Sequence, residues 1–221
     1  MESKAWDWKK VKGSNKENIW IEPSVESYYL INRWKNQNKK EFLDLGCGLG
    51  RHTVQFAKSG FKTCSMDLSE TSVEETKNWC KNENLDVNFV VGDMLKLPYE
   101  EDQFDCILSY NVINHTDTNG IKKIISELYR VLKTDGEAYL TLTSKETWGW
   151  KQDHPLVDEN TKIKMETEEE NGIPHFYADY NLILELFKDF KIEDLIHNQK
   201  IYERDGVIRE SWHYHILISK T

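Results

Sequence analysis

The sequence has few of the residues that most often hold metals or form disulfides. It contains only four cysteines, Cys47, Cys64, Cys80 and Cys106, and no two of them are in C-x-x-C spacing. No group of cysteines and histidines has the spacing of a zinc site, so we expect no bound metal. The four cysteines are typical of small buried residues in a reducing compartment.

Long apolar runs and an excess of positive charge are missing as well. No apolar run approaches the length that spans a bilayer, and residues 1–8 lack the apolar stretch of a signal peptide. The chain has 38 acidic and 29 basic residues, a net charge of -9, which disfavours binding to phosphate backbones. A lysine-rich stretch near the start is interspersed with acidic residues, and we interpret it as a solvated terminus. We therefore expect a cytoplasmic protein that binds neither membranes nor nucleic acid.

What the sequence does have is a regular alternation of strand and helix patterns. Short apolar runs predict buried strands. Helical patterns lie between them: one helix ends at Gly60, one begins after Ser69 or Thr71, and one covers residues 121–132. Such alternation is typical of an α/β protein with a parallel sheet. The expected strands cover residues 41–45, 62–66, 87–91, 104–109 and 137–143.

The two ends of the chain depart from this pattern. Before the first strand, a helix is predicted over residues 23–35. Near the end of the chain, a helix is predicted over residues 182–190 and an extended segment over residues 191–197. Apolar and polar residues alternate over 211–219, which predicts a strand with one less buried face. Residues 145–180 show no clear period and are interpreted as a lid-like insertion. We therefore divide one domain into a helical cap (1–40), a core (41–144), this insertion and a C-terminal part (181–221).

The most informative stretch is FLDLGCGLGRH, residues 42–52, which lies between the first strand and its helix. Three alternating glycines allow a ligand to approach the backbone, and a helix N-terminus favours negative charge. Asp67 ends the second strand about twenty residues later, where a carboxylate binds ribose hydroxyls. A dinucleotide fingerprint would have glycine in place of Arg51, and no G-K-[ST] follows to make a P-loop. These features favour an adenosine-containing ligand.

Four motifs in this order resemble the class I S-adenosylmethionine-dependent methyltransferases. They are the glycine loop with Asp44, the strand-ending Asp67, Gly92-Asp93-Met94 after the third strand, and the fourth strand, residues 104–109. The chain is most similar in character to small-molecule enzymes of the ubiquinone-biosynthesis and tellurite-resistance type. The resemblance implies a Rossmann-like, doubly wound sheet of seven strands, mostly parallel with an antiparallel C-terminal strand, and helices on both faces.

The resemblance also implies a cofactor, S-adenosylmethionine, and the residues that hold it. Asp44 and Gly46 would face its methionine end, Asp67 its ribose, and Asp93 with the Met94 N–H its adenine. The full set of implied cofactor residues is Asp44, Gly46, Cys47, Gly48, Gly50, Arg51, Asp67, Leu68, Asp93, Met94, Ser109 and Tyr110.

The acceptor side is less defined by motifs. His115 follows the fourth strand, near the crevice of an open α/β sheet, and is a candidate general base. Trp20, Asn111, His175 and Tyr177 are candidate contacts to a small-molecule acceptor. Three other functions stay open at this point: a cofactor-binding module without catalysis, a methyltransferase acting on RNA or protein, and a dinucleotide oxidoreductase. The acceptor and the oligomeric state are not indicated.

Overall fold

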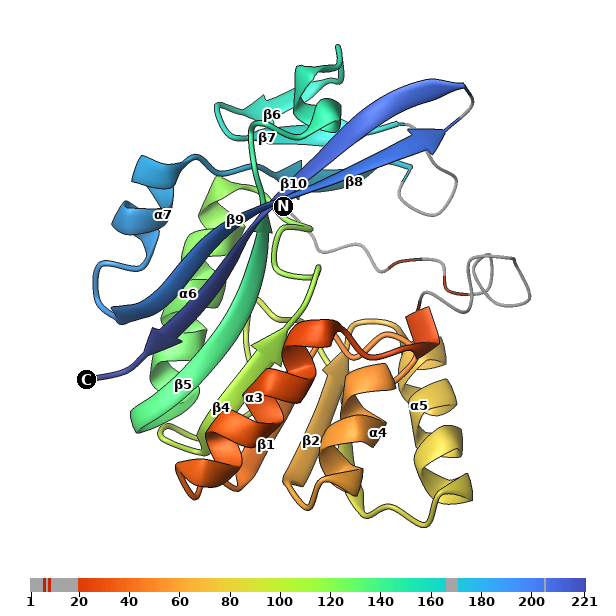
Figure 1. The fold of residues 1–221 in the computed structure, drawn as a ribbon, viewed down its shortest axis with the longest axis vertical. Coiled ribbons are helices and arrows are strands. Elements are labelled where there is room, and N and C mark those ends of the chain that lie inside the picture. Colours follow the sequence, from red (N-terminus) through yellow and green to blue (C-terminus); the bar gives the residue numbers. More distant parts are fainter. Residues whose placement is uncertain (1–5, 7, 9–19, 166–170, 205) are drawn as a thin grey trace.

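Strands from distant parts of the chain pair into one seven-stranded sheet. The computed structural model describes residues 6, 8, 20–165, 171–204 and 206–221. The strand order across the sheet is β3-β2-β1-β4-β5-β10-β9 (Figure 1). Strands β1 to β5 pair in parallel, and β10 is antiparallel to both of its neighbours, as the resemblance implies. The strand bounds are β1 (Glu41–Leu45), β2 (Lys62–Asp67), β3 (Val87–Val91), β4 (Phe104–Ser109), β5 (Leu132–Thr143), β9 (Lys191–Arg204) and β10 (Val207–Ser219).

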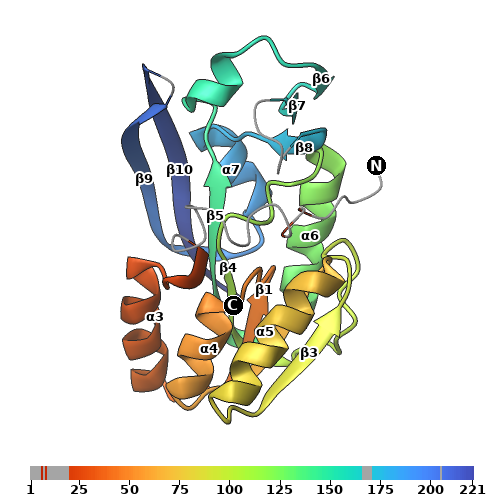
Figure 2. The same cartoon turned by 90° about the vertical axis from the view of Figure 1, so that its right-hand side faces the viewer.

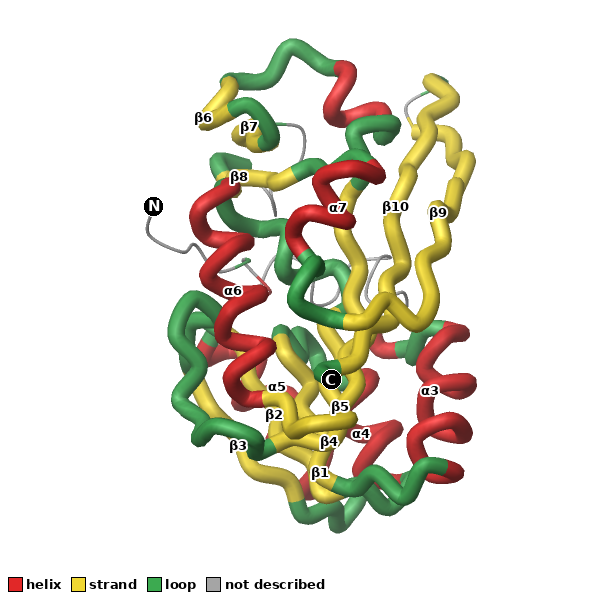
Figure 3. The backbone as a smooth tube through the Cα atoms, turned by 90° about the vertical axis from the view of Figure 1, so that its left-hand side faces the viewer, coloured by secondary structure: helices red, strands yellow, loops and turns green. Residues whose placement is uncertain are grey.

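Helices cover both faces of this sheet (Figures 2 and 3). One face carries α3 (Val25–Asn36), α4 (Arg51–Lys58) and α5 (Glu70–Asn82), and the other carries α6 (Thr118–Val131) and α7 (Tyr180–Leu186). The apolar residues of α6 that recur at helical spacing are all buried, as their period predicts. Among the described residues, no helix is both long and apolar enough to cross a membrane.

The two faces bury two separate apolar clusters because successive strand residues point in opposite directions. In β1, Leu43 packs into the larger cluster under α6 and α7, whereas Phe42 packs against α3 and α4. Phe42 stacks on Phe56 of α4 with ring centroids 3.9 Å apart. The central strands β1 and β4 are therefore buried on both sides, which explains why they read as largely apolar runs.

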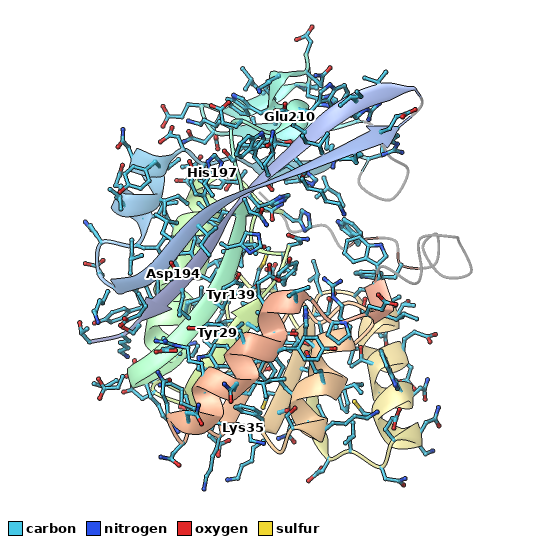
Figure 4. The ribbon with its side chains drawn as sticks, viewed as in Figure 1. Tyr29, Lys35, Tyr139, Asp194, His197 and Glu210 are labelled. Atoms are coloured by element: carbon cyan, nitrogen blue, oxygen red, sulfur yellow. The ribbon has the colours of Figure 1, made fainter. Side chains whose placement is uncertain are left out.

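The prediction that β10 has one less buried face is wrong for its C-terminal half. Ile216 and Ile218 lie in the larger cluster, but Leu217 on the other face is also buried, at 3% exposure. His215 is buried as well, and its Nδ1 lies 2.7 Å from the hydroxyl of Tyr139, a residue labelled in Figure 4. Helix α3 covers this face, and its position is set by contacts that no local pattern encodes.

Residues 145–180 contain regular structure that the sequence analysis does not predict. They include a 3-10 helix (Trp148–Lys151) and a separate antiparallel sheet, in which β7 lies between β6 and β8. Figure 1 shows this small sheet at the same end of the molecule as the long β9–β10 hairpin. The strands are short, β6 (Leu156–Asp158), β7 (Thr161–Lys164) and β8 (Ile173–Phe176), which explains why their period is hard to detect.

Several element boundaries also differ from the prediction. Helix α5 (Glu70–Asn82) is capped by Ser69, one of the two predicted positions, whose hydroxyl accepts from the Ser72 N–H. Strand β5 begins at Leu132 rather than at residue 137, and β9 continues to Arg204. The expected helix over 182–190 is confirmed only as α7, which ends at Leu186.

One buried carboxylate fastens α3 to the sheet. Glu137 of β5 accepts hydrogen bonds from Arg33 Nε and Nη2 (2.8 and 2.7 Å), Trp34 Nε1 (2.8 Å) and Gln37 Nε2 (3.0 Å). Burial alone would raise the pKa of Glu137, but these donors outweigh burial and lower it. The carboxylate is thus charged and fully partnered at neutral pH.

We predict that Glu137→Gln lowers the free energy of unfolding by about 2–4 kcal/mol at pH 7, because it removes the charged partner of Arg33 from a buried site. Urea unfolding measures the change. The matched control is Glu41→Gln, since Glu41 pairs with an exposed Lys62 at 2.9 Å, and its loss should cost less than about 1 kcal/mol.

The contribution of Glu137 to the free energy of unfolding should also depend on pH. Because the folded pKa of Glu137 is depressed, its contribution is present above the unfolded pKa of about 4.3 and disappears as pH falls below that value. Equal losses for the two variants at pH 7, or a difference that grows on acidification, would contradict the assigned role.

Candidate functional site

The glycine loop between β1 and α4 is held by backbone bonds to the neighbouring strand. The N–H groups of Gly46 and Cys47 both donate to the Met66 carbonyl of β2, at 2.7 and 3.0 Å. Gly46, Gly48 and Gly50 all have positive φ, at 78°, 55° and 90°. A Cβ on Gly46 would collide with Val112, so the loop passes too close to its neighbours for a side chain at that position.

Two strand-ending carboxylates lie beside this loop. The Asp67 carboxylate accepts from the N–H of Gly48 and from the N–H of Ser69, both at 2.9 Å, which joins the loop to the start of α5. Burial raises the pKa of Asp67, and these two backbone bonds oppose the shift. Asp93 follows β3 and accepts from the Leu95 N–H at 2.9 Å. The carboxyl ends of the parallel strands therefore gather acceptor groups around the loop.

A cavity opens in front of the loop. Most of the predicted cofactor residues line it, and so do Trp20, Asn111 and His115. The guanidinium of Arg51 lies 5.5 Å from the ring centroids of both Trp20 and Tyr110. The predicted cofactor residues in the lining are Gly46, Cys47, Gly48, Arg51, Asp67, Leu68, Asp93, Met94 and Tyr110.

Three predicted cofactor residues, Asp44, Gly50 and Ser109, do not line the cavity. Asp44 is buried and accepts from the Thr53 hydroxyl at 2.6 Å, and burial raises its pKa to about 6. The Ser109 hydroxyl donates to the Leu45 carbonyl at 3.0 Å.

A second cavity, of about 210 Å³, adjoins the first. Trp20, Asn111 and His115 line both cavities, and His175 and Tyr177 line only the second. The imidazole of His115 lies edge-on to that of His175, with ring centroids 4.8 Å apart. The structure thus brings every predicted acceptor residue to one place, although they come from three separate segments of the chain.

Asn111 stands at the junction of the two cavities in a left-handed backbone conformation, with φ at 60°. Thr141 of β5 holds it there: the Thr141 hydroxyl accepts from the Asn111 N–H at 2.7 Å and donates to its side-chain oxygen at 3.1 Å. Asparagine is one of the residues that adopt positive φ most readily, and these two bonds fix its side chain at the junction.

Sequence reasoning misses several residues of these cavities. Trp6 and Trp8, in a stretch interpreted as a solvated terminus, line the first cavity, and Trp8 packs closely over Gly48. Lys164 and His213 line the second cavity. The alternation of β10 places His213 and Trp212 on opposite faces of the strand. No local sequence pattern indicates that the face with His213 lies near β7 and the loop after β4.

This arrangement defines a Rossmann-like α/β fold with a ligand cavity at the carboxyl ends of its strands. Residues 42–136 match the family model described as a methyltransferase domain. A SAM-dependent methyltransferase from Methanosarcina mazei shares the fold, with a TM-score of 0.72 at 18% identity over 90% of this chain and 99% of that one. Residues 42–136 therefore carry a methyltransferase domain, on a fold that is shared with S-adenosylmethionine-dependent methyltransferases.

Curated relatives match over part of their length. The sterol 24-C-methyltransferase of Saccharomyces cerevisiae is 28% identical over 156 residues, which cover 68% of this chain and 38% of the relative. The ubiquinone biosynthesis O-methyltransferase of Rickettsia akari is 25% identical over 112 residues, covering 50% and 43%. The chain thus spans about two fifths of the length of these two relatives.

The residues present fit S-adenosylmethionine. The cavity offers carboxylates for the ribose and adenine at Asp67 and Asp93, a glycine loop in its lining, and the cationic Arg51 for a carboxylate. Among the described residues, no three histidine, cysteine or acidic side chains are grouped so as to hold a metal ion. The contact that each residue makes with the cofactor stays a prediction.

We predict that Gly46→Ala destabilises the protein more than Gly60→Ala. Both residues have positive φ, at 78° and 89°, so both variants carry a similar backbone cost of about 1–2 kcal/mol. Only the Gly46 variant meets a neighbour, Val112, which adds about 1–3 kcal/mol, whereas nothing lies within 4 Å of a Cβ on Gly60. Urea unfolding compares the two; equal losses would show that Val112 moves aside freely.

We also predict that Asp67→Ala weakens binding of S-adenosylhomocysteine, the demethylated cofactor, by about 1.5–3 kcal/mol, because a charge-assisted contact to the ribose is lost. Calorimetric titration measures the affinity. Asp86→Ala, at an exposed position outside the cavity lining, removes the same charge and should leave the affinity unchanged. Unchanged affinity in the Asp67 variant would remove Asp67 from the ribose role.

Proposed function

We propose that this chain transfers the methyl group of S-adenosylmethionine to a small-molecule acceptor. The observation that carries the proposal is the junction of the two cavities, where Trp20, Asn111 and His115 face both. A donor in the first cavity and an acceptor in the second would meet at this junction. Holding two reactants in this way supplies much of the rate acceleration in a direct transfer.

The cofactor, when bound, supplies a methyl group on an electron-poor sulfonium. In the proposal, Asp67, Asp93 and the Met94 N–H hold its adenosine part, while Arg51 and the glycine loop hold its methionine part. The aromatic side chains of Trp20 and Tyr110 exclude water from the junction. His115 accepts the proton of an acceptor that arrives protonated.

The relatives favour a small-molecule acceptor. Those named above are a sterol methyltransferase and a ubiquinone-biosynthesis methyltransferase. The second cavity is also partly enclosed by residues 145–180 and by β10, which suits a small molecule better than a polymer. We further place the reaction in the cytoplasm, a location that the four free cysteines favour.

The test uses cofactor with a deuterated methyl group, incubated with the protein and a metabolite extract. We expect mass spectrometry to find the label in a small molecule, and we expect His115→Asn to lower the rate at least about tenfold while S-adenosylhomocysteine affinity stays the same. Tyr129→Phe, on a partly exposed side chain outside both cavities, is the control and should keep full activity.

Other outcomes separate the remaining functions. Label in protein or RNA would indicate a macromolecular acceptor. Cofactor binding without any transfer of label would indicate a binding module without catalysis. An unchanged rate for His115→Asn would remove His115 as the base and leave the transfer itself in place.

A further inference from the structure

The main sheet ends in two edge strands of very different length. Strand β3 has 5 residues, whereas β9 has 14, and among the described residues β9 pairs only with β10. Figures 2 and 3 both show β9 at the outer margin of the sheet, and residues 196–203 of this strand are all exposed. A long open edge presents a row of backbone N–H and C=O groups with which another strand can pair.

Three large apolar side chains of this edge strand are exposed. Ile196, Ile201 and Tyr202 are 51%, 62% and 37% exposed. Because strand side chains alternate, Ile196 and Tyr202 lie on one face of β9 and Ile201 on the other. A second strand beside β9 would therefore cover apolar groups on both faces of the sheet.

The edge also carries charged side chains, which commonly prevent pairing with other chains. On one face of β9, Asp194 lies near the start and Lys200 toward the end, and neither forms an ion pair with a described residue. On the other face the order is reversed, because Lys191 lies at the start and Glu203 near the end. This pattern suits a partner strand of the same sequence that runs in the opposite direction.

Two-fold symmetry restricts how two copies of β9 can pair. Opposite residues of an antiparallel pair lie on the same face, so the axis of a symmetric, continuous sheet must pass beside a residue and not between two. With the axis at His197, Asp194 of each copy lies opposite Lys200 of the other. In the same register, Lys191 lies opposite Glu203. Both faces then pair opposite charges, and residues 191–203 make about 44 Å of paired strand.

The neighbouring registers lack this match. Moving the axis to Asn198 sets Glu193 against Glu203, two carboxylates on one face. Moving it to Ile196 sets Asp194 opposite Asn198 and leaves no oppositely charged pair. Since like charges directly opposite each other are unfavourable, the charges of this edge favour one register of self-pairing over the others.

The centre of the paired edge carries no charge. His197, labelled in Figure 4, stacks on Tyr214 of β10 with ring centroids 4.2 Å apart. Partial burial lowers the pKa of His197, so the two imidazoles that meet at the axis are neutral at pH 7. The Ile196 side chains of the two copies lie diagonally across the axis on the other face. An uncharged centre with charged ends is the usual anatomy of a protein interface.

We propose that two copies of this chain associate through β9, antiparallel and with the two-fold axis at His197, so that one sheet continues across both copies. The observation that carries the proposal is the self-complementary charge on both faces of an exposed edge strand. The inference is independent of methyl transfer. It has a consequence for the second cavity, because Tyr202 lines that cavity and Ile192 of the other copy would lie opposite Tyr202.

Analytical ultracentrifugation of the whole chain, over a dilution series, measures the association. We expect a species with twice the mass of the 26.1 kDa chain. Asp194→Lys and Lys200→Glu should each raise the dissociation constant of the dimer at least about tenfold, because each creates two like-charged pairs. Combining both substitutions swaps the charges and should return the constant to within about threefold of the original. Lys81→Glu, at an exposed position of α5, is the control and should have no effect.

A cysteine at the axis tests the register without a change of charge. His197→Cys should form a disulfide between the two copies, because directly opposite residues have Cα atoms about 5 Å apart. Gln199→Cys is the matched control on the same face, since the two copies of this residue are offset by about 14 Å along the edge. Non-reducing electrophoresis separates the linked and unlinked chains.

The results that would overturn the proposal are distinct from those that support it. A monomer at every concentration, or a dimer that neither single charge substitution weakens, shows that β9 is not the interface. A dimer that the charge swap does not restore, or a disulfide that forms at Gln199 in preference to His197, contradicts the proposed register.

Discussion

The parallel pairing of β1 with β2 is the constraint on which both halves of the site depend. Its register sets Leu45 beside Met66, so that the Met66 carbonyl receives the N–H groups of Gly46 and Cys47. The same register ends β2 at Asp67, within hydrogen-bond distance of the Gly48 N–H. A slip of one residue would reverse the faces of β2 and separate the loop from its carboxylate. The position of the first cavity thus follows from backbone pairing before any ligand is present.

The cofactor half and the acceptor half differ in how much the sequence reveals. Gly46, Asp67 and Asp93 stand at the ends of consecutive strands, and each strand is recognisable from a short local pattern, so the sequence was enough to place these residues near one another. The acceptor cavity takes Asn111 from the loop after β4, Lys164 from β7 and His213 from β10. No short stretch contains two of these elements. Sequence reasoning therefore found Asn111, which lies next to a motif, and missed Lys164 and His213.

Burial is a second property that local pattern did not predict well. Alternation over β10 identified the strand and assigned its residues to the correct faces, but it suggested one less buried face. The structure covers that face with α3, held by Glu137 through residues about one hundred positions earlier. Asp44 illustrates the same limit, because its place next to the glycine loop did not reveal that Thr53 and the sheet enclose it.

The position of β10 between β5 and β9 has a consequence for the order in which the molecule is built. Strands β1 to β5, with the glycine loop, Asp67 and Asp93, leave the ribosome first. The described acceptor residues Lys164, His175 and His213 follow, and β10 must insert beside β5 after β9 has been made. The cofactor half is therefore complete in sequence while the acceptor wall is still being synthesised. A nascent chain at that stage contains the glycine loop and its two carboxylates, but not yet the strands that enclose the second cavity.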